Sequence, residues 1–212
     1  MYDSIIFDLD GTLWDSTENV ASAFRELLDN KYPEVTDEVT ADKLKSLFGQ
    51  LLDDIAVQLF KSVPADKAIA IMDECCEYEC EYLEKHGATL FDGIEETIKK
   101  LHKNYKLYIV SNCQEGYIQC FFSVFPELEK YFLDFEYPGR TNLPKADNIK
   151  LVVERNKLRN PVYVGDTAGD AKAAKEASVP FIYARYGFGQ VEEYDNVIDS
   201  PIELVDILGH NK

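Results

Sequence analysis

The sequence predicts a doubly wound, Rossmann-like α/β fold, in which helices cover both faces of a parallel sheet, together with an inserted all-helical part. Short apolar segments rich in β-branched and aromatic residues alternate with segments of helical periodicity, which is the pattern of βαβ units. Between residues 16 and 87 this alternation stops, and only helical patterns occur. We therefore expect an α/β core formed by residues 1–15 and 88–212 and a helical domain formed by residues 16–87.

The strands of the core are expected where apolar runs are too short for a helix. They cover residues 4–9, 106–112, 161–167 and 180–184, with a weaker candidate at 132–137. Between them, apolar residues recur at spacings of three and four, which predicts helices over residues 92–104, 145–156 and 168–177.

Helical periodicity fills the inserted part. Helices are expected over residues 16–30, 38–60 and 65–87, with no strand-like run between them. Pro33 and Pro64 separate these helices, and Gly87 is expected to end the last one.

The composition excludes several classes of partner. The net charge of −17 opposes binding to nucleic acid and to anionic membrane surfaces, because both require clustered Lys and Arg. No stretch approaches the roughly 20 apolar residues of a membrane span, and Met1 leads directly into a strand-like segment instead of a signal sequence. Five cysteines without a CxxC pair favour a reducing compartment, so we expect a cytoplasmic protein.

Three of these cysteines, Cys75, Cys76 and Cys80, lie close together in an expected helix. No histidine and no second cysteine cluster completes the four ligands of a zinc site. We therefore interpret them as small apolar residues of the helix.

Polar side chains follow three of the expected strands. They belong to the segments DLDGT at residues 8–12, SN at residues 111–112 and GDTAGD at residues 165–170. Ligand sites of open α/β sheets form beyond the carboxyl ends of the strands, so these segments are expected to meet in one crevice. Carboxylates crowded in this way repel one another unless a cation neutralises them, and oxygen ligands without His or Cys favour Mg²⁺.

The same segments resemble the motifs of the haloacid dehalogenase superfamily, on its phosphatase side, and most of all the phosphoglycolate-phosphatase-like hydrolases. The four motifs occur in the family's order, as DLDGT at 8–12, SN at 111–112, Lys145 and GDTAGD at 165–170. The helical insertion after the first strand resembles the family's helical cap. Four motifs in order, each at an expected strand end or helix start, make an accidental match improbable.

The resemblance implies a role for each aspartate. Asp8 resembles the nucleophile that attacks phosphorus and becomes an aspartyl phosphate, and Asp10 resembles the general acid and base. Two positions apart in an extended chain, the two side chains project to the same side. The resemblance also implies Mg²⁺ bound by the Asp8 side chain, the Asp10 backbone carbonyl and the Asp166 side chain, with Asp170 holding metal-bound water.

The resemblance also implies that further residues hold the phosphoryl group, through hydrogen bonds and positive charge. These are Gly11, which lets the backbone approach closely, and Thr12, Ser111, Asn112 and Lys145.

Some of these residues have ordinary structural alternatives. Ser111 is also explained as a helix N-cap, Asp170 as a first-turn carboxylate and Lys145 as a solvated residue at a helix start. The family often places proline after the motif lysine, whereas here Pro144 precedes it, which leaves Lys150 as the second candidate for the motif lysine.

The cap should select the substrate, because it closes over the site. The loop SLFGQLLDD at 46–54 resembles the cap loop that points into the site, and its candidate substrate contacts are Phe48, Gln50 and the nearby cation Lys45. Phe48 as cap core and Gln50 as a solvated residue are the alternatives. The loop lacks the arginine that some relatives carry there, which weakens both a phosphoglycolate and a sugar-phosphate mutase assignment.

The sequence as a whole predicts a Mg²⁺-dependent phosphatase that acts on a small phosphorylated metabolite. A haloacid dehalogenase would not need Asp10 or a metal site at Asp166. A phosphomutase of the β-phosphoglucomutase type shares all four motifs but needs cap groups that grip a second phosphate. A member of the family that only binds a ligand would be expected to lack one of the motif aspartates, and all of them are present.

Overall fold

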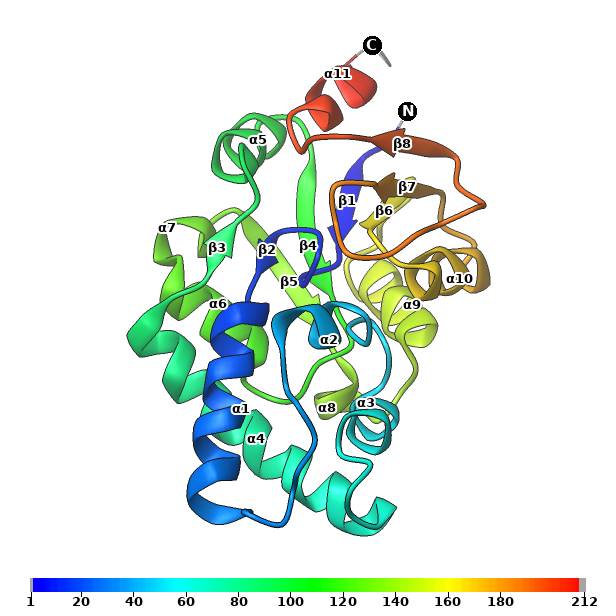
Figure 1. Cartoon of the computed structure of the whole chain (residues 1–212). Helices are drawn as coiled ribbons and strands as arrows, with labels where there is room; N and C mark the ends of the chain where they lie inside the picture. The colour runs from blue at the N-terminus through cyan, green and yellow to red at the C-terminus, as the bar shows by residue number, and fades with distance from the viewer. Residues whose placement is uncertain (1, 210–212) are drawn as a thin grey trace.

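The computed structural model describes residues 2–209 and contains a six-stranded, all-parallel sheet (Figure 1). The strand order across the sheet is β5-β4-β1-β6-β7-β8. This is the doubly wound order, in which the direction of winding reverses beside the first strand. The strands are β1 Ser4–Phe7, β4 Lys106–Val110, β5 Phe132–Glu136, β6 Pro161–Gly165, β7 Phe181–Ala184 and β8 Asn196–Ile198. The predicted fold class is confirmed.

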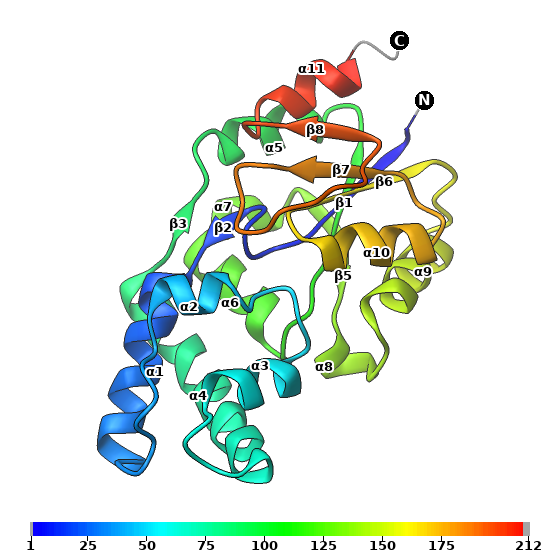
Figure 2. The ribbon, with the colours of Figure 1, turned by 45° about the vertical axis from the view of Figure 1, so that its right-hand side comes forward.

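Helices cover both faces of the sheet, because the side chains of each strand alternate between the faces. In β1, Ile5 and Phe7 belong to one apolar cluster and Ile6 to the other. The first cluster lies under α5 (Ile94–Leu101), α6 (Tyr117–Val124), α7 (Pro126–Glu129) and α11 (Glu203–Gly209). The second lies under α9 (Lys145–Arg155) and α10 (Ala168–Glu176), and the short α8 (Pro138–Thr141) precedes α9 (Figures 1 and 2).

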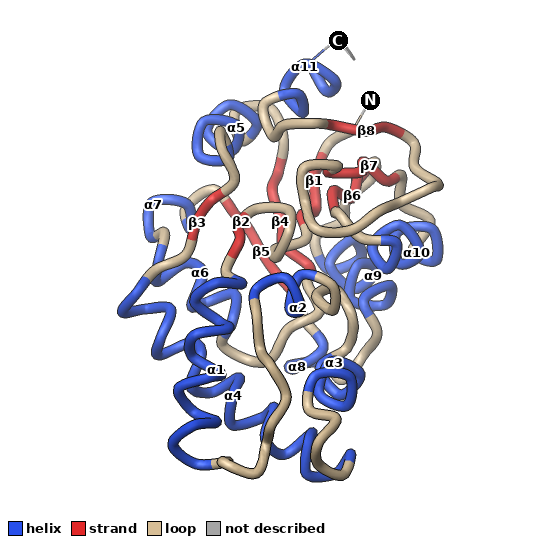
Figure 3. Tube along the Cα trace, in the orientation of Figure 1, coloured by secondary structure: helices blue, strands red, loops and turns tan. Residues whose placement is uncertain are grey.

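The inserted segment contains helices only and lies at the carboxyl ends of the strands (Figure 3). Its helices are α1 Thr17–Lys31, α2 Ala41–Lys45, α3 Leu52–Leu59 and α4 Ala65–His86. Two antiparallel strands of two residues each, β2 (Trp14–Asp15) and β3 (Thr89–Leu90), connect it to the core. We propose that residues 16–87 form a cap over a core of residues 1–15 and 88–212. None of the helices within residues 2–209 is long and apolar enough to cross a membrane.

The expectation of one helix over residues 38–60 is wrong, because the structure has two shorter helices there, α2 and α3. The segment between them turns at Gly49, whose φ of +87° is incompatible with a continuous right-handed helix. The turn carries Phe48 and Gly49 toward the core, where Asn112 donates a hydrogen bond to the Gly49 carbonyl over 2.9 Å. The sequence patterns also missed β2, β3 and β8, which are only two or three residues long.

The connection between core and cap is anchored by Trp14. Its side chain is fully buried, and its ring packs edge-on against Tyr117 and Phe121 of α6 at centroid distances of 5.6 and 5.2 Å. This packing holds the segment from Asp10 to Ser16 against α6.

Candidate active site

Asp8 lies one residue beyond the end of β1, in contact with a buried lysine. Lys145 begins α9, and its ammonium group donates to Asp8 Oδ1 over 2.8 Å and to Asp170 Oδ1 over 2.6 Å. All three side chains are at most 4% exposed. Burial and the neighbouring Asp170 raise the pKa of Asp8 to about 6, although Lys145 opposes this shift. The ammonium group therefore supplies the counter-charge that stabilises two carboxylates that water cannot reach.

A third carboxylate, that of Asp166, joins this group from the end of β6. One oxygen of each of Asp8, Asp166 and Asp170 lies within 4.8 Å of the others. Asp166 accepts hydrogen bonds from the backbone N–H of Phe188 over 2.7 Å and from the Thr12 hydroxyl over 3.4 Å. Burial and the two neighbouring carboxylates raise the Asp166 pKa well above its usual value. Hard oxygen donors crowded without His or Cys fit a magnesium ion.

Asp170 has a second function in the local fold. Its Oδ2 accepts from the backbone N–H and the hydroxyl of Thr167, and the Thr167 hydroxyl accepts from the Asp170 N–H, which together form a capping box at the start of α10. One of its carboxyl oxygens thus caps the helix while the other faces Lys145. Asp170 is therefore both a carboxylate in the first turn of its helix, as the alternative explanation expected, and a partner of Lys145.

Asp10 occupies a different environment from Asp8. Its Oδ1 accepts hydrogen bonds from the Ser16 hydroxyl over 2.8 Å and from the Tyr117 hydroxyl over 3.0 Å. Burial raises its pKa to about 7 in spite of these donors. The two motif aspartates therefore differ in their partners, since Asp8 faces an ammonium group and Asp10 faces two neutral hydroxyls. The sequence patterns did not identify Ser16 or Tyr117, because only the folded chain brings them to Asp10.

Gly11 allows the backbone to pass close to Asp166. Its φ is +81°, and a Cβ atom added there would lie 2.2 Å from Asp166 Oδ2. Ser111, which follows β4, is buried, and its hydroxyl lowers the Asp8 pKa.

Of the two candidate lysines, only Lys145 contacts Asp8 and Asp170. Lys150 is exposed on the outer side of α9, where it pairs with Asp147 over 2.9 Å.

A small cavity lies between the core aspartates and the cap. We call it the cap cavity; core residues Asp8, Asp10 and Asn112 and cap residues Phe48 and Glu79 are among those that line it. Its free volume is about 40 Å³, little more than the roughly 30 Å³ that one water molecule occupies in the liquid.

Two expected substrate contacts do not line the cap cavity. Lys45 pairs with Asp15 over 2.9 Å, and Gln50 accepts a hydrogen bond from Gln58 over 2.7 Å. Phe48 lines the cavity and also packs edge-on against Phe188 of the core, at a centroid distance of 6.3 Å.

Glu79 and Gln114 line the same cavity, and the motifs pointed to neither. A signal for Glu79 was present in the sequence. On a helix it falls on the face formed by Cys75, Cys76 and Leu83, and a carboxylate on an apolar helix face is unusual.

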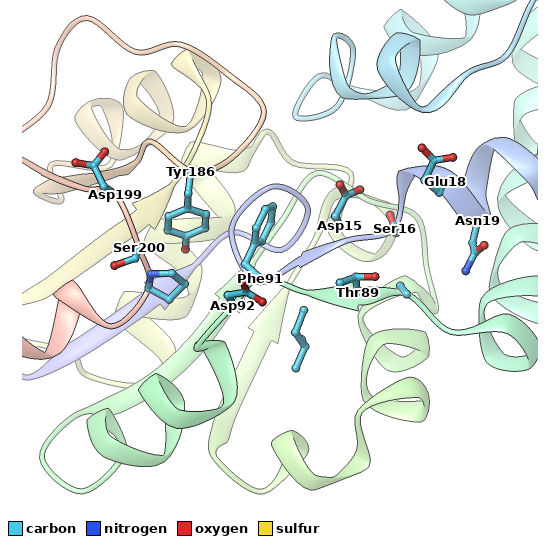
Figure 4. Close-up of a pocket in the computed structure, with 13 residues that line it drawn as sticks. Asp15, Ser16, Glu18, Asn19, Thr89, Phe91, Asp92, Tyr186, Asp199 and Ser200 are labelled. Atoms are coloured by element: carbon cyan, nitrogen blue, oxygen red, sulfur yellow. The ribbon is translucent and has the colours of Figure 1, made fainter.

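A larger hollow of about 590 Å³ lies outside this site, at the connection between core and cap (Figure 4). It is lined by Asp15, Ser16, Phe91 and Tyr186, among others, and by none of the carboxylates of Asp8, Asp10 or Asp166. The cap cavity is therefore our candidate active site, because both Asp8 and Asp10 line it and Asp8 is in turn held by the buried Lys145.

Residues 5–184 match the family model described as haloacid dehalogenase-like hydrolase. The phosphoglycolate phosphatase of Vibrio parahaemolyticus is 25% identical, and the match covers 96% of this chain and 95% of that protein. The phosphoglycolate phosphatase of Photobacterium profundum is 26% identical, with 96% and 94% covered.

Solved structures share the fold. A predicted phosphatase from Clostridium acetobutylicum has a TM-score of 0.79 at 23% identity, with 99% of each chain covered. A predicted phosphoglycolate phosphatase from Haemophilus somnus has a TM-score of 0.82 at 18% identity, with 98% of each chain covered.

Proposed function

Because the chain belongs to the haloacid dehalogenase-like hydrolase family, we propose that it is a Mg²⁺-dependent phosphatase that hydrolyses a small phosphorylated metabolite through an aspartyl phosphate. The expected class of enzyme, a phosphoric monoester hydrolase, is confirmed by the family and by the phosphoglycolate phosphatases that resemble the chain over almost its whole length. The observation that carries the proposed mechanism is the different environment of the two motif aspartates, Asp8 and Asp10.

The first step of this mechanism is an attack by Asp8. A carboxylate oxygen of Asp8 forms a bond to phosphorus while the bond between phosphorus and the ester oxygen breaks. The departing alcohol oxygen takes a proton from Asp10. A pKa of about 7 supports this role, because a substantial fraction of Asp10 is then protonated at neutral pH.

The second step returns the enzyme to its starting state. Asp10, now a carboxylate, takes a proton from a water molecule whose oxygen attacks phosphorus. The bond between Asp8 and phosphorus breaks, and inorganic phosphate leaves. Ser16 and Tyr117 keep Asp10 oriented in both steps, since both hydroxyls donate to the same carboxyl oxygen.

Positive charge supports both steps. Asp8 and Asp166 would hold Mg²⁺ together with the Asp10 backbone carbonyl, and Asp170 would hold metal-bound water. A bound Mg²⁺ would supply positive charge that stabilises the transferring phosphoryl group. Lys145 adds its own charge at Asp8, and Thr12, Ser111 and Asn112 would supply hydrogen bonds. The crowding of three carboxylates within 4.8 Å supports this set of ligands.

The alternatives are less well supported. A phosphomutase needs positive charge in the cap for a second phosphate, and the described residues that line the cap cavity include no Lys, Arg or His. A purely ligand-binding protein has no use for an acid with a raised pKa beside a nucleophile.

Five free cysteines support the expected reducing, cytoplasmic compartment.

The test is the release of inorganic phosphate from a panel of small phosphate esters, with Mg²⁺ and with a chelator, by the wild type and Asp8→Asn. We expect turnover that requires Mg²⁺ and falls by at least about a thousandfold in the variant, because the nucleophile is lost. Turnover that persists in chelator or in Asp8→Asn would contradict the mechanism.

A further inference from the structure

We propose that the alcohol part of the substrate carries no negative charge and presents a hydrogen-bond donor, a hydroxyl or an ammonium group, to Glu79 of the cap. This inference rests on the proposed phosphatase function and names the class of ester that the site accepts. It separates this chain from its phosphoglycolate phosphatase relatives, because the alcohol part of phosphoglycolate ends in a carboxylate.

Glu79 is a buried carboxylate that faces the cap cavity. It lies in α4 and is 4% exposed. The Gln114 side-chain amide donates a hydrogen bond to its Oε1. Its Oε2 accepts no hydrogen bond from any residue in the described part of the chain and is not one of the fully buried unpaired atoms, so it is accessible to a ligand in the cavity.

Asn112 supplies a second acceptor without a partner. Its amide nitrogen donates to the Gly49 carbonyl, and this hydrogen bond turns the amide so that Oδ1 is buried with no donor among residues 2–209. An unpaired buried acceptor is costly, and a ligand that brings donors removes that cost. The polar lining of the cavity thus calls for donors on the ligand.

No positive charge lies in the cavity to meet an anionic alcohol. The described residues of its lining contain three carboxylates, Asp8, Asp10 and Glu79, and no Lys, Arg or His. Lys145 lies behind Asp8 and is already shared with Asp170. A carboxylate on the substrate would therefore be buried beside Glu79 without a counter-charge, which is strongly unfavourable.

The protonation of Glu79 does not change this conclusion. Burial raises its pKa well above the usual value, and the nearby charge of Asp10 adds to the shift. The protonated form can donate one hydrogen bond to a carboxylate on the ligand but gives it no counter-charge, whereas an ammonium group would stabilise the charged form of Glu79. A hydroxyl can hydrogen-bond to either form. The remaining lining includes Phe24, Leu44 and Met72, which suit the carbon atoms of a small alcohol.

The test compares four phosphate esters of two-carbon alcohols that differ in one terminal group. They are phosphoethanolamine with an ammonium group, 2-hydroxyethyl phosphate with a hydroxyl, ethyl phosphate with a methyl and phosphoglycolate with a carboxylate. We expect kcat/KM for the ammonium and hydroxyl esters to exceed that for phosphoglycolate by at least about tenfold.

Glu79→Gln tests whether this preference comes from Glu79. The substitution keeps the size and the acceptor but removes the charge. The ratio of kcat/KM for phosphoethanolamine to that for phosphoglycolate should fall by about tenfold or more, chiefly through KM. Glu81→Gln, at an exposed position of the same helix, is the matched control and should leave the ratio unchanged. Because each ratio is measured in one preparation, a loss of folded protein cancels.

The outcomes separate this inference from the proposed function. Phosphoglycolate hydrolysed as well as or better than the other esters would overturn the inference and leave the phosphatase function standing. An unchanged ratio in Glu79→Gln would also overturn it. If none of the four esters nor any of the wider panel released phosphate, the proposed function would fail, and the inference with it.

Discussion

Replacing Lys145 by methionine should destabilise the protein strongly when metal is removed. The substitution keeps a side chain of similar length but leaves Asp8 and Asp170, both nearly inaccessible to water, without their shared counter-charge. Removing one partner of a buried ion pair costs about 3–5 kcal/mol, and here one ammonium group serves two carboxylates. We therefore expect the free energy of unfolding at pH 7 to fall by about 3 kcal/mol or more in chelator.

The sign of the pH dependence follows from the pKa values. Burial opposes the charge on Lys145, but Asp170 and Asp8 raise its pKa above the usual value, so its contribution is fully present at pH 7. The Asp8 pKa is about 6. As the pH falls below that value the carboxylate becomes protonated, and the loss caused by Lys145→Met should shrink.

The measurement is urea unfolding of the wild type and Lys145→Met at pH 7 and pH 5, each with chelator and with Mg²⁺. Lys150→Met is the matched control, because it removes a lysine from the same helix whose pair with Asp147 is nearly half exposed, and it should cost less than about 1 kcal/mol. Mg²⁺ should restore part of the loss in Lys145→Met, since it supplies charge to the same carboxylates. Equal stability of the two variants in chelator would refute the reasoning.

Three further predictions concern residues around the other motif aspartates, Asp10 and Asp166. Tyr117→Phe removes one of two donors to Asp10 and should lower kcat about tenfold with little change in KM; an unchanged kcat would show that this hydroxyl does not position Asp10. Gly11→Ala should cost roughly 2 kcal/mol or more of stability, measured by urea unfolding, because the new Cβ would meet Asp166 at a strained φ; a variant as stable as the wild type would mean that the backbone shifts freely there. The pKa of Asp10 is raised to about 7, so in chelator the native state should become less stable as the pH rises from 5 to 8, by roughly 2–3 kcal/mol. Asp10→Asn should remove this part of the pH dependence, as measured by urea unfolding. Equal pH dependence in the variant and the wild type would contradict the prediction.

The positions of the motif aspartates were predictable because parallel strands all end at one edge of the sheet. Once β1 and β6 are recognised, Asp8 and Asp166 must meet, since the two strands are neighbours in register from Ser4 opposite Pro161. The contacts of Asp10 were not predictable in this way. Tyr117 lies 107 positions away, and only the packing of Trp14 on α6 brings the two together.

The choice between the two candidate lysines was predictable from the sequence. The buried residues of α9 include Lys145, Ala146, Ile149 and Val152, which form one helical stripe, whereas Lys150 lies outside it. The helical period alone thus distinguishes the two lysines. The turn between α2 and α3 was harder to predict, because the apolar residues on both sides of Gly49 continue the helical pattern of the neighbouring segments.

The central place of β1 has a consequence for biosynthesis. β1 is made well before its two partners in the sheet, because β4 and β6 begin only at Lys106 and Pro161. At about 5–20 residues per second, one edge of this apolar strand stays unpaired for roughly 8–30 seconds. The cap helices α1 and α4, which pack on each other, can form in the meantime. Asp166 follows β6, the last strand to join β1, so the nascent chain carries the crowded carboxylates only after both neighbours of β1 have been made.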